Sequence, residues 1–215
     1  MDPLNRLLRF VFFRLVVRPV VGIALGVTVR HRERLPADGP AVLVANHNSH
    51  LDTMVLMTLL PPRLLPKVRP VAAADYFLKN RLMAWFSLRI IGILPIVRGG
   101  GKSGDPLAAV HDALARGEIV ILFPEGSRGE PERLSEFKSG VAHLARAHPE
   151  VPVIPAFLHG LGKSLPKGSA VFVPFCCDVV IGEPIPWQED RKLYLQELRE
   201  RMSALAGEVD LAVWE

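Results

Sequence analysis

A run of five apolar residues, 119–123, constrains the fold of this chain more than any other feature. Such an uninterrupted run is typical of a strand with both faces buried, as in the middle of a parallel sheet. Further strands are expected over 41–46, 68–72, 93–97, 151–157 and 170–181. Because segments with helical patterns separate these strands, the sequence predicts an α/β fold with a mixed, largely parallel sheet flanked by helices.

The 215 residues are enough for one α/β domain with a terminal appendage. We expect an N-terminal segment over residues 1–34 and a single domain over 35–215, with its motifs within 35–160. Helices are expected over 50–60, 76–91, 105–117, 138–147 and 195–205. Asp105 is the predicted capping residue of the third of these helices, and Gly117 is predicted to end it.

The basic character of the chain is concentrated at its N-terminus. Residues 1–34 carry seven arginines against two acidic residues, whereas the remaining chain has 19 basic and 20 acidic residues. A basic and apolar end indicates a partner with an anionic membrane surface. A nucleic-acid partner is not expected, because it would require a basic patch within the folded domain.

The segment 10–29 is nearly long enough to span a bilayer, but Arg14, Arg18 and Pro19 interrupt it. An arginine at the centre of a spanning helix costs about 2.5 kcal/mol or more, which disfavours that arrangement. Arginines inside the apolar region also argue against a signal peptide. The sequence favours one or two short helices lying in the membrane interface, with a break at Pro19. The alternative is a helix packed on the protein's own core.

Two adjacent cysteines, Cys176 and Cys177, lie in the last predicted strand. A disulfide between neighbours is strained, so we expect two free, small and apolar side chains. The absence of a disulfide framework suits a reducing compartment.

A base and a carboxylate, His47 and Asp52, follow the strand 41–46. In a continuous helix, side chains five positions apart point about 140° away from each other. They can meet if the helix begins between them, with Ser49 as its N-cap. The carboxylate would then accept a hydrogen bond from one ring nitrogen of His47 and leave the other nitrogen as a base.

The same residues have other interpretations. A lone His–Asp pair is more often structural than catalytic. His47, His50 and Asp52 could ligate a metal, but three candidate ligands within six residues are a weak signal, and no metal site is expected. His50 is expected to begin the helix rather than act as a second base.

A second polar motif follows the apolar strand 119–123, where α/β sheets place binding sites. It contains Glu125, Gly126, Ser127 and Arg128. The Arg128 guanidinium suits bidentate recognition of phosphate, and Gly126 allows a ligand to approach the backbone. Glu125 would repel phosphate, so it is expected to accept from a substrate hydroxyl or to hold Arg128. The alternative is a surface turn with an ion pair.

Two further basic residues are weaker candidates for anion binding. Arg98 follows the strand 93–97 and precedes three glycines, an arrangement compatible with an anion site. Lys138 is expected to be a surface lysine rather than a phosphate ligand.

Taken in order, four blocks resemble the glycerolipid acyltransferase family typified by 1-acyl-sn-glycerol-3-phosphate acyltransferase. The blocks are His-x4-Asp at His47 and Asp52, Gly-x-x-x-Ile-x-Arg at 92–98, Phe-Pro-Glu-Gly-Thr-Arg at 123–128 with Ser127 in place of Thr, and Val-Pro-Ile-Ile-Pro at 151–155 with Val153 in place of the first Ile. Two departures concern the acceptor side: Val97 stands where members often carry Asp or Asn, and Gly129 stands where Ser is frequent.

The resemblance implies an acyltransferase domain in which His47 is the general base and Asp52 orients it. His47 would deprotonate an acceptor hydroxyl, which attacks the thioester of acyl-CoA or acyl-carrier protein. No bound cofactor and no acyl-enzyme are implied. Arg98 and the block Glu125, Gly126, Ser127 and Arg128 would bind the acceptor's phosphate or polar head. The acceptor most consistent with the family is 1-acyl-sn-glycerol-3-phosphate, which would give phosphatidic acid.

Other functions remain open at this stage. The acceptor could be another lysophospholipid or a lyso-ornithine lipid, the base could activate water for thioester hydrolysis, or the protein could bind lipid without catalysis. The resemblance and the N-terminal segment together imply an enzyme associated with the cytoplasmic face of a membrane, with membrane lipids and the acyl donor as partners. Leu82, Trp85 and Phe86 could line an acyl groove or belong to an ordinary core.

Overall fold

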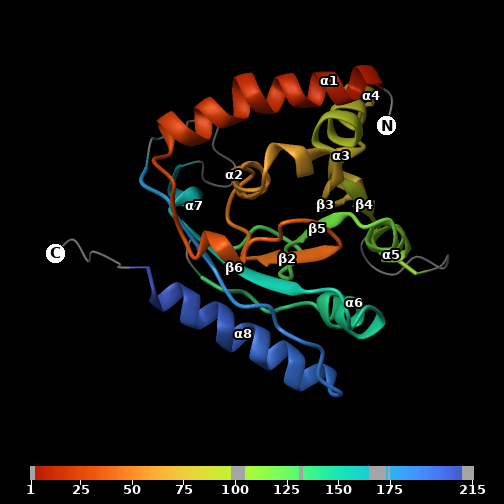
Figure 1. The fold of residues 1–215 in the computed structure, drawn as a ribbon, viewed down its shortest axis with the longest axis vertical. Coiled ribbons are helices and arrows are strands. Elements are labelled where there is room, and N and C mark those ends of the chain that lie inside the picture. The colour runs from red at the N-terminus through yellow and green to blue at the C-terminus, as the bar shows by residue number, and fades with distance from the viewer. Residues whose placement is uncertain (1–2, 98–104, 131–132, 165–172, 174, 210–215) are drawn as a thin grey trace.

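The computed structural model describes residues 3–97, 105–130, 133–164, 173 and 175–209 (Figure 1). Within these residues a seven-stranded sheet has the order β1-β7-β6-β2-β5-β3-β4. Its strands are β1 (Thr28–Arg30), β2 (Ala41–Ala45), β3 (Val68–Ala73), β4 (Leu94–Ile96), β5 (Ile119–Leu122), β6 (Val153–His159) and β7 (Asp178–Ile181). Neighbouring strands of this sheet are parallel except for the pair β6–β7. The predicted fold class is therefore confirmed.

Helices cover both faces of the sheet. The α-helices are α1 (Pro3–Phe12), α2 (Leu51–Leu59), α3 (Ala74–Phe77), α4 (Arg81–Trp85), α5 (Ala108–Ala115), α6 (Gly140–Ala147), α7 (Leu161–Ser164) and α8 (Arg191–Gly207). Short π-helical turns are η1 (Phe13–Val17), η2 (Val20–Ala24) and η5 (Phe86–Ile91), and 3-10 turns are η3 (Arg32–Arg34) and η4 (Pro62–Lys67). The helices α1 and α2 lie on one side of the sheet, and α6 and α8 lie on the other (Figure 1).

The central strands are buried on both faces because their alternate side chains enter two different cores. In β2, Leu43 packs with the N-terminal helix and α2, whereas Val42 and Val44 pack with α5, α6 and α8. In β5, Ile121 faces the first core and Val120 faces the second. Two-sided burial explains why these strands read as continuous apolar runs in the sequence.

The N-terminal segment is helical from Pro3 onward and does not break at Pro19, contrary to the prediction. Pro19 has helical dihedral angles, with φ −61° and ψ −42°, and lies between the π-helical turns η1 and η2. A proline is tolerated there because backbone hydrogen bonding is already irregular in π-helical turns. Within the described part of the chain, no helix has both the length and the apolar character needed to cross a bilayer.

The two faces of this segment have different environments. Phe13, Val17 and Val21 are buried and belong to the core between α2 and the sheet. The exposed side of α1 and η1 carries Leu4, Leu7, Leu8, Val11 and Leu15. The alternative of packing on the protein's own core is therefore correct for one face, and an apolar face remains exposed.

Several predicted boundaries are wrong. The single helix expected over 76–91 is interrupted between α3 and α4, because the Asn80 side chain accepts a hydrogen bond from the Met83 N–H and starts a new helix; α4 continues directly into η5. The helix α5 begins at Ala108, after a turn in which Asp105 accepts from the Leu107 N–H. Of the strand expected over 170–181, only β7 is present within the described residues. Residues 170–172 and 174 lie outside them.

The two cysteines are free, as expected, but they precede β7 instead of lying on a strand. Cys176 is exposed and Cys177 is buried. Burial raises the pKa of the Cys177 thiol to about 11.

Candidate active site

The two polar motifs lie at the same edge of the sheet. The strands β2 and β5 are parallel neighbours, so the residues that follow both strands leave the sheet at its carboxyl edge. Asn46 fixes the first of these connections, because its side chain donates to the Leu158 carbonyl at 2.9 Å and accepts from the Leu158 N–H at 2.7 Å. The backbone that carries His47 is therefore tied to the neighbouring strand β6.

The predicted contact between His47 and Asp52 is present. His47 Nδ1 lies 2.9 Å from Asp52 Oδ2. The same carboxylate oxygen accepts from the backbone N–H groups of Asn48 at 2.7 Å and Ser49 at 2.8 Å. Asp52 is fully buried, and the His47 side chain is 18% exposed. With Nδ1–H directed to the carboxylate, Nε2 is the ring nitrogen that can receive a proton.

The start of α2 differs from the prediction in one detail. His50, and not Ser49, occupies the N-cap position before Leu51. The Asp52 carboxylate accepts a hydrogen bond from the Ser49 N–H. The Ser49 hydroxyl accepts only one hydrogen bond, of 3.3 Å, from the Leu51 N–H. A carboxylate in the first turn has replaced the expected hydroxyl as the group that satisfies the free N–H groups near the helix start.

His50 begins the helix, as predicted, and contacts Tyr76. Its ring stacks on the Tyr76 ring at 5.7 Å between centroids, and its Nε2 lies 3.3 Å from the Tyr76 hydroxyl. Burial lowers the pKa of His50, and the nearby positive charge of Arg128 lowers it further. Arg128 is therefore close enough to the helix start for its charge to act there.

The loop after β5 contacts His47. The His47 ring stacks on Phe123 with 4.0 Å between centroids, and the Gly129 N–H donates to the His47 carbonyl at 2.9 Å. A Cβ atom on Gly129 would lie 2.9 Å from Ser135 Oγ and 3.1 Å from Glu125 Oε2. Gly129, which stands where serine is frequent in the family that the sequence resembles, therefore lies close to both side chains, and a larger residue would require them to shift.

Glu125 is buried beside His47. Burial raises the pKa of its carboxyl to about 7, and the His47 backbone N–H and the Ser135 hydroxyl oppose this rise. Neither carboxyl oxygen makes a hydrogen bond of good geometry to a described residue. The group therefore changes charge near neutral pH.

The remaining predicted residues of this loop are more exposed. Gly126 has φ +72°, a left-handed conformation that favours glycine. Ser127 is exposed and Arg128 is half-buried. Lys138 is exposed, in agreement with its interpretation as a surface lysine, and its backbone N–H donates to the Pro124 carbonyl at 2.7 Å.

Arg98 lies outside the described residues, as do the glycines that follow it. The strand β4 ends at Ile96 and runs parallel to β3, so it ends toward the carboxyl edge of the sheet. In the part of the chain that the structure describes, no group of three His, Cys, Asp or Glu side chains is placed to hold a metal ion.

A cavity of about 330 Å³ near the end of α2 was not predicted. Its lining residues come from the N-terminal helix, α2 and η4; they are Phe10, Phe13, Arg14, Arg18, Met57, Thr58, Leu60, Pro62 and Leu65. Leu82, Trp85 and Phe86 do not line it. Leu82 and Trp85 are exposed, whereas Phe86 packs edge-on against Phe12 beside the core.

Comparisons with known proteins identify the family of the chain. A family model described as Acyltransferase matches residues 26–159. The chain is 33% identical over 145 residues to the chloroplastic 1-acyl-sn-glycerol-3-phosphate acyltransferase LPAT1 of Arabidopsis thaliana, covering 66% of this chain and 38% of that protein. It is 28% identical over 166 residues to 1-acyl-sn-glycerol-3-phosphate acyltransferase alpha of Homo sapiens, covering 74% and 55%. The chain thus spans about two-fifths to just over half the length of these relatives.

The fold is also similar to a solved structure. The crystal structure of the 1-acyl-sn-glycerophosphate acyltransferase PlsC from Thermotoga maritima superposes with a TM-score of 0.74 at 19% sequence identity. The match covers 99% of this chain and 97% of that one. At this level of identity the likeness establishes a common fold.

Proposed function

The chain belongs to the acyltransferase family, and on that premise we propose that it transfers a fatty acyl group from an acyl thioester to a lyso-lipid hydroxyl. The proposed acceptor is 1-acyl-sn-glycerol-3-phosphate, because the two relatives described above are named for that substrate. The contact of 2.9 Å between His47 Nδ1 and the buried Asp52 carboxylate carries the proposal. It supplies an oriented base at the edge of the sheet where a substrate can bind.

The proposed reaction uses the ring nitrogen of His47 that does not contact Asp52. His47 Nε2 removes the proton from the acceptor hydroxyl as its oxygen attacks the thioester carbonyl. The tetrahedral intermediate collapses to the new ester, the sulfur leaves, and the proton on His47 passes to it. Asp52 stabilises the imidazolium that forms between these steps, as a buried carboxylate does in a catalytic triad. No acyl-enzyme is required, and binding both substrates side by side supplies much of the rate.

Arg128 is the proposed ligand of the acceptor phosphate among the described residues. Its charge acts on the helix start beside His47, and a guanidinium binds phosphate with two parallel hydrogen bonds. Ser127 and the backbone at Gly126 are exposed next to it. Arg98 is proposed as a second ligand on the basis of the sequence motif.

Glu125 is proposed to bind a substrate hydroxyl. A carboxyl group with a pKa of about 7 is partly protonated at neutral pH, so it can donate a hydrogen bond as well as accept one. Asp52 differs from it in its contacts, because one Asp52 oxygen accepts three hydrogen bonds from residues 47–49.

The 330 Å³ cavity is proposed to hold part of a hydrocarbon chain. The helix α2 connects the two sites, since it begins beside His47 and contributes Met57 to the cavity. Six residues of α-helix separate Leu51 from Met57, about 9 Å along the helix axis. Apolar side chains dominate the lining, as expected of a site for an acyl chain.

The exposed apolar face of α1 supports docking on a membrane. Leu4, Leu7, Leu8, Val11 and Leu15 are between 37% and 68% exposed. On a helix they share the face opposite the buried Arg9 and Phe13. We propose that residues 1–34 hold the domain 35–215 at the cytoplasmic face of an anionic membrane, with their other face packed on the core.

A product analysis tests the proposal. Purified protein receives labelled acyl-CoA or acyl-carrier protein together with 1-acyl-sn-glycerol-3-phosphate, a lysophospholipid with a neutral head, a lyso-ornithine lipid, or no acceptor. Labelled phosphatidic acid is the expected product. Free fatty acid alone would indicate thioester hydrolysis, and bound but unreacted acyl donor would indicate a binding protein. An ester formed only with another lyso-lipid would show that the protein is an acyltransferase with a different acceptor.

A further inference from the structure

Arg9 on α1 is buried without enough hydrogen-bond partners. Its side chain is 2% exposed, and its Nη2 donates to the Val68 carbonyl at 2.9 Å. Its Nε and Nη1 are buried and have no hydrogen-bond partner among the described residues. An arginine offers five N–H donors, and leaving several of them unpaired away from water is costly.

Arg9 also lacks a counterion of its own. Burial lowers the pKa of its guanidinium to about 9, as does the neighbouring Arg69, so the group stays charged at neutral pH. The acidic residue that acts on it, Glu118, is already paired with Arg69 at 2.8 Å and Arg116 at 3.1 Å. A buried positive charge of this kind is stabilised when an anion joins it.

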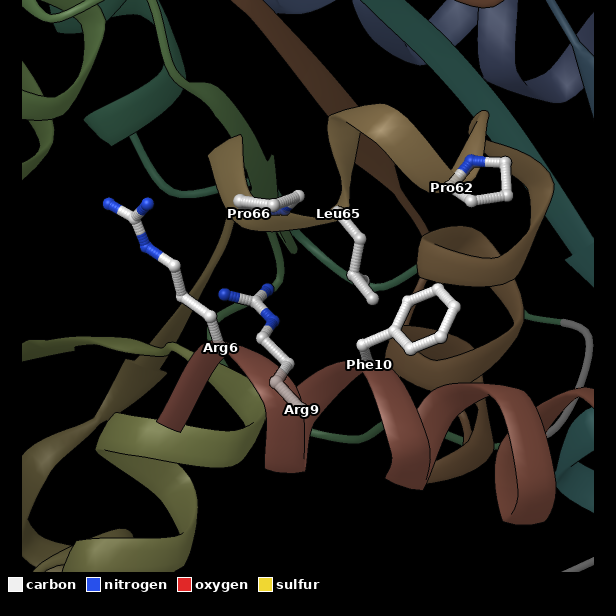
Figure 2. A pocket seen from close by; sticks show the side chains of 6 residues that line it. All are labelled: Arg6, Arg9, Phe10, Pro62, Leu65 and Pro66. Carbon is white, nitrogen blue, oxygen red and sulfur yellow. The ribbon is translucent and has the colours of Figure 1, made fainter. Parts of the chain in front are cut away.

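A small cavity lies directly beside Arg9 (Figure 2). It measures about 30 Å³ and is lined by Arg6, Arg9, Phe10, Pro62, Leu65 and Pro66. In Figure 2 the side chains of Arg6 and Arg9 rise from the same side of the helix toward η4. Arg6 is exposed and Arg9 is buried, so the cavity is lined by one exposed and one buried arginine. Its volume admits one or two oxygen-sized groups, so oxygens of a phosphoryl group can enter while the rest of the molecule stays outside.

This cavity is distant from the His47 site but adjoins the 330 Å³ cavity, with which it shares Phe10, Pro62 and Leu65. Arg9 donates to Val68, the first residue of β3, whereas His47 follows the last residue of β2. Both strands are parallel neighbours of β5, so their first and last residues lie at opposite ends of the sheet. A ligand at Arg9 would therefore not occupy the position of the acceptor beside His47.

We propose that the cavity between α1 and η4 binds the phosphoryl group of an anionic membrane lipid through Arg6 and Arg9. Two guanidinium groups three positions apart on one helix can share the oxygens of one phosphate. The exposed aromatic side chain of Phe10 on α1 lines the cavity, which favours a lipid over a free phosphate as the source. The proposal rests on the membrane docking proposed above and adds a specific head-group site to it.

Binding of short-chain lipids to the full chain tests this site. The probes are dihexanoylphosphatidylglycerol and dihexanoylphosphatidylcholine, each below its micelle concentration, and inorganic phosphate. The readout is the melting temperature at increasing probe concentration, which gives an apparent affinity. The variants are Arg9→Met, Arg6→Gln at the exposed entrance, and Arg128→Gln in the candidate active site. Arg89→Gln is the matched control, because Arg89 is exposed on η5, a segment that contacts α1.

Phosphatidylglycerol is expected to raise the melting temperature of the wild type, Arg89→Gln and Arg128→Gln. Its affinity should fall about tenfold or more in Arg6→Gln and Arg9→Met, since each loses charged hydrogen bonds. A shift in melting temperature that depends on Arg9 but occurs with inorganic phosphate alone would support the site and identify its ligand as free phosphate instead of a lipid. Equal shifts in all variants, loss only in Arg128→Gln, or no shift with any probe would overturn the proposal. Because binding is measured without turnover, its failure is distinct from failure of the proposed acyl transfer.

Discussion

Two buried charged groups, Asp52 and Arg9, lie at opposite ends of the same sheet and differ in how they are satisfied. One oxygen of Asp52, Oδ2, accepts three hydrogen bonds from the adjoining residues 47–49, whereas Oδ1 is buried with no partner among the described residues. Arg9 makes one hydrogen bond to Val68, and two of its nitrogens have no partner among the described residues. The Asp52 carboxylate is therefore held in place by its neighbours in the chain through one oxygen, whereas the Arg9 guanidinium has a single hydrogen bond and is completed by a ligand. Asp52 keeps the His47 base in position, whereas the charge of Arg9 is compensated by the head group of a lipid.

The largest effect is expected from Asp52→Asn. The amide keeps the shape of the carboxylate but loses the charge that orients His47 and stabilises its protonated form. Acyl transfer should fall by about 10²- to 10⁴-fold, as when general-base catalysis is removed. The measurement is kcat/KM for phosphatidic acid formation. Asp75→Asn is the matched control, because Asp75 is exposed in the first turn of α3. A variant at Asp52 with the turnover of this control would contradict the assigned role.

A smaller effect is expected when the cavity beyond α2 is filled. Met57 is 2% exposed and lines the cavity, so Met57→Trp should shorten the acyl chains that the enzyme prefers. The ratio of rates with long and short acyl-CoA should change by about tenfold, since one or two methylenes in an apolar pocket change the discrimination between substrates by about that factor. Leu82→Trp, at an exposed position outside the cavity, should leave the ratio unchanged. Equal chain preference in both variants would argue against the cavity as the acyl site.

A third effect concerns the pH dependence of stability. Burial raises the pKa of the Glu125 carboxyl from its ordinary value of about 4.5 to about 7 in the folded protein, so the folded state binds the proton more tightly. The stability gained from the protonated group is full below about pH 4.5 and is lost as the pH rises through 7. The melting temperature of the wild type should therefore fall relative to that of Glu125→Gln over this range, by a few degrees for each kcal/mol lost. If the melting temperatures of the wild type and Glu125→Gln change by the same amount from pH 4.5 to 8, the pKa of Glu125 is not raised in the folded protein.

The central strands and the paired site residues could be predicted from local sequence. The strands β2 and β5 are apolar on both faces and connect directly to polar residues, so their buried position in the sheet and the edge of the site follow from one pattern. The contact of His47 with Asp52 required only a helix start between them. Its capping detail was missed because Ser49 is a stronger N-cap signal than a carboxylate in the first turn.

The remaining features depend on segments that are distant in the chain. The cavity joins Phe13 to Met57 and Leu65, and the Arg9 site joins α1 to Pro66. Arg6 and Arg9 are three positions apart, a spacing compatible with one helical face, but the sequence gives no indication that η4 would cover Arg9. The continuation of the helix through Pro19 was also hidden, because a proline is read locally as a break and π-helical turns have no sequence signal of comparable strength.

The most direct measurement is kcat/KM for phosphatidic acid formation by His47→Ala with labelled acyl-CoA and 1-acyl-sn-glycerol-3-phosphate. His143→Ala is the matched control, because His143 is exposed on α6 at the other face of the sheet. With His47 as the general base, its variant should lose about 10²-fold or more while the control keeps the wild-type rate. A rate for His47→Ala within about twofold of the control would contradict the account.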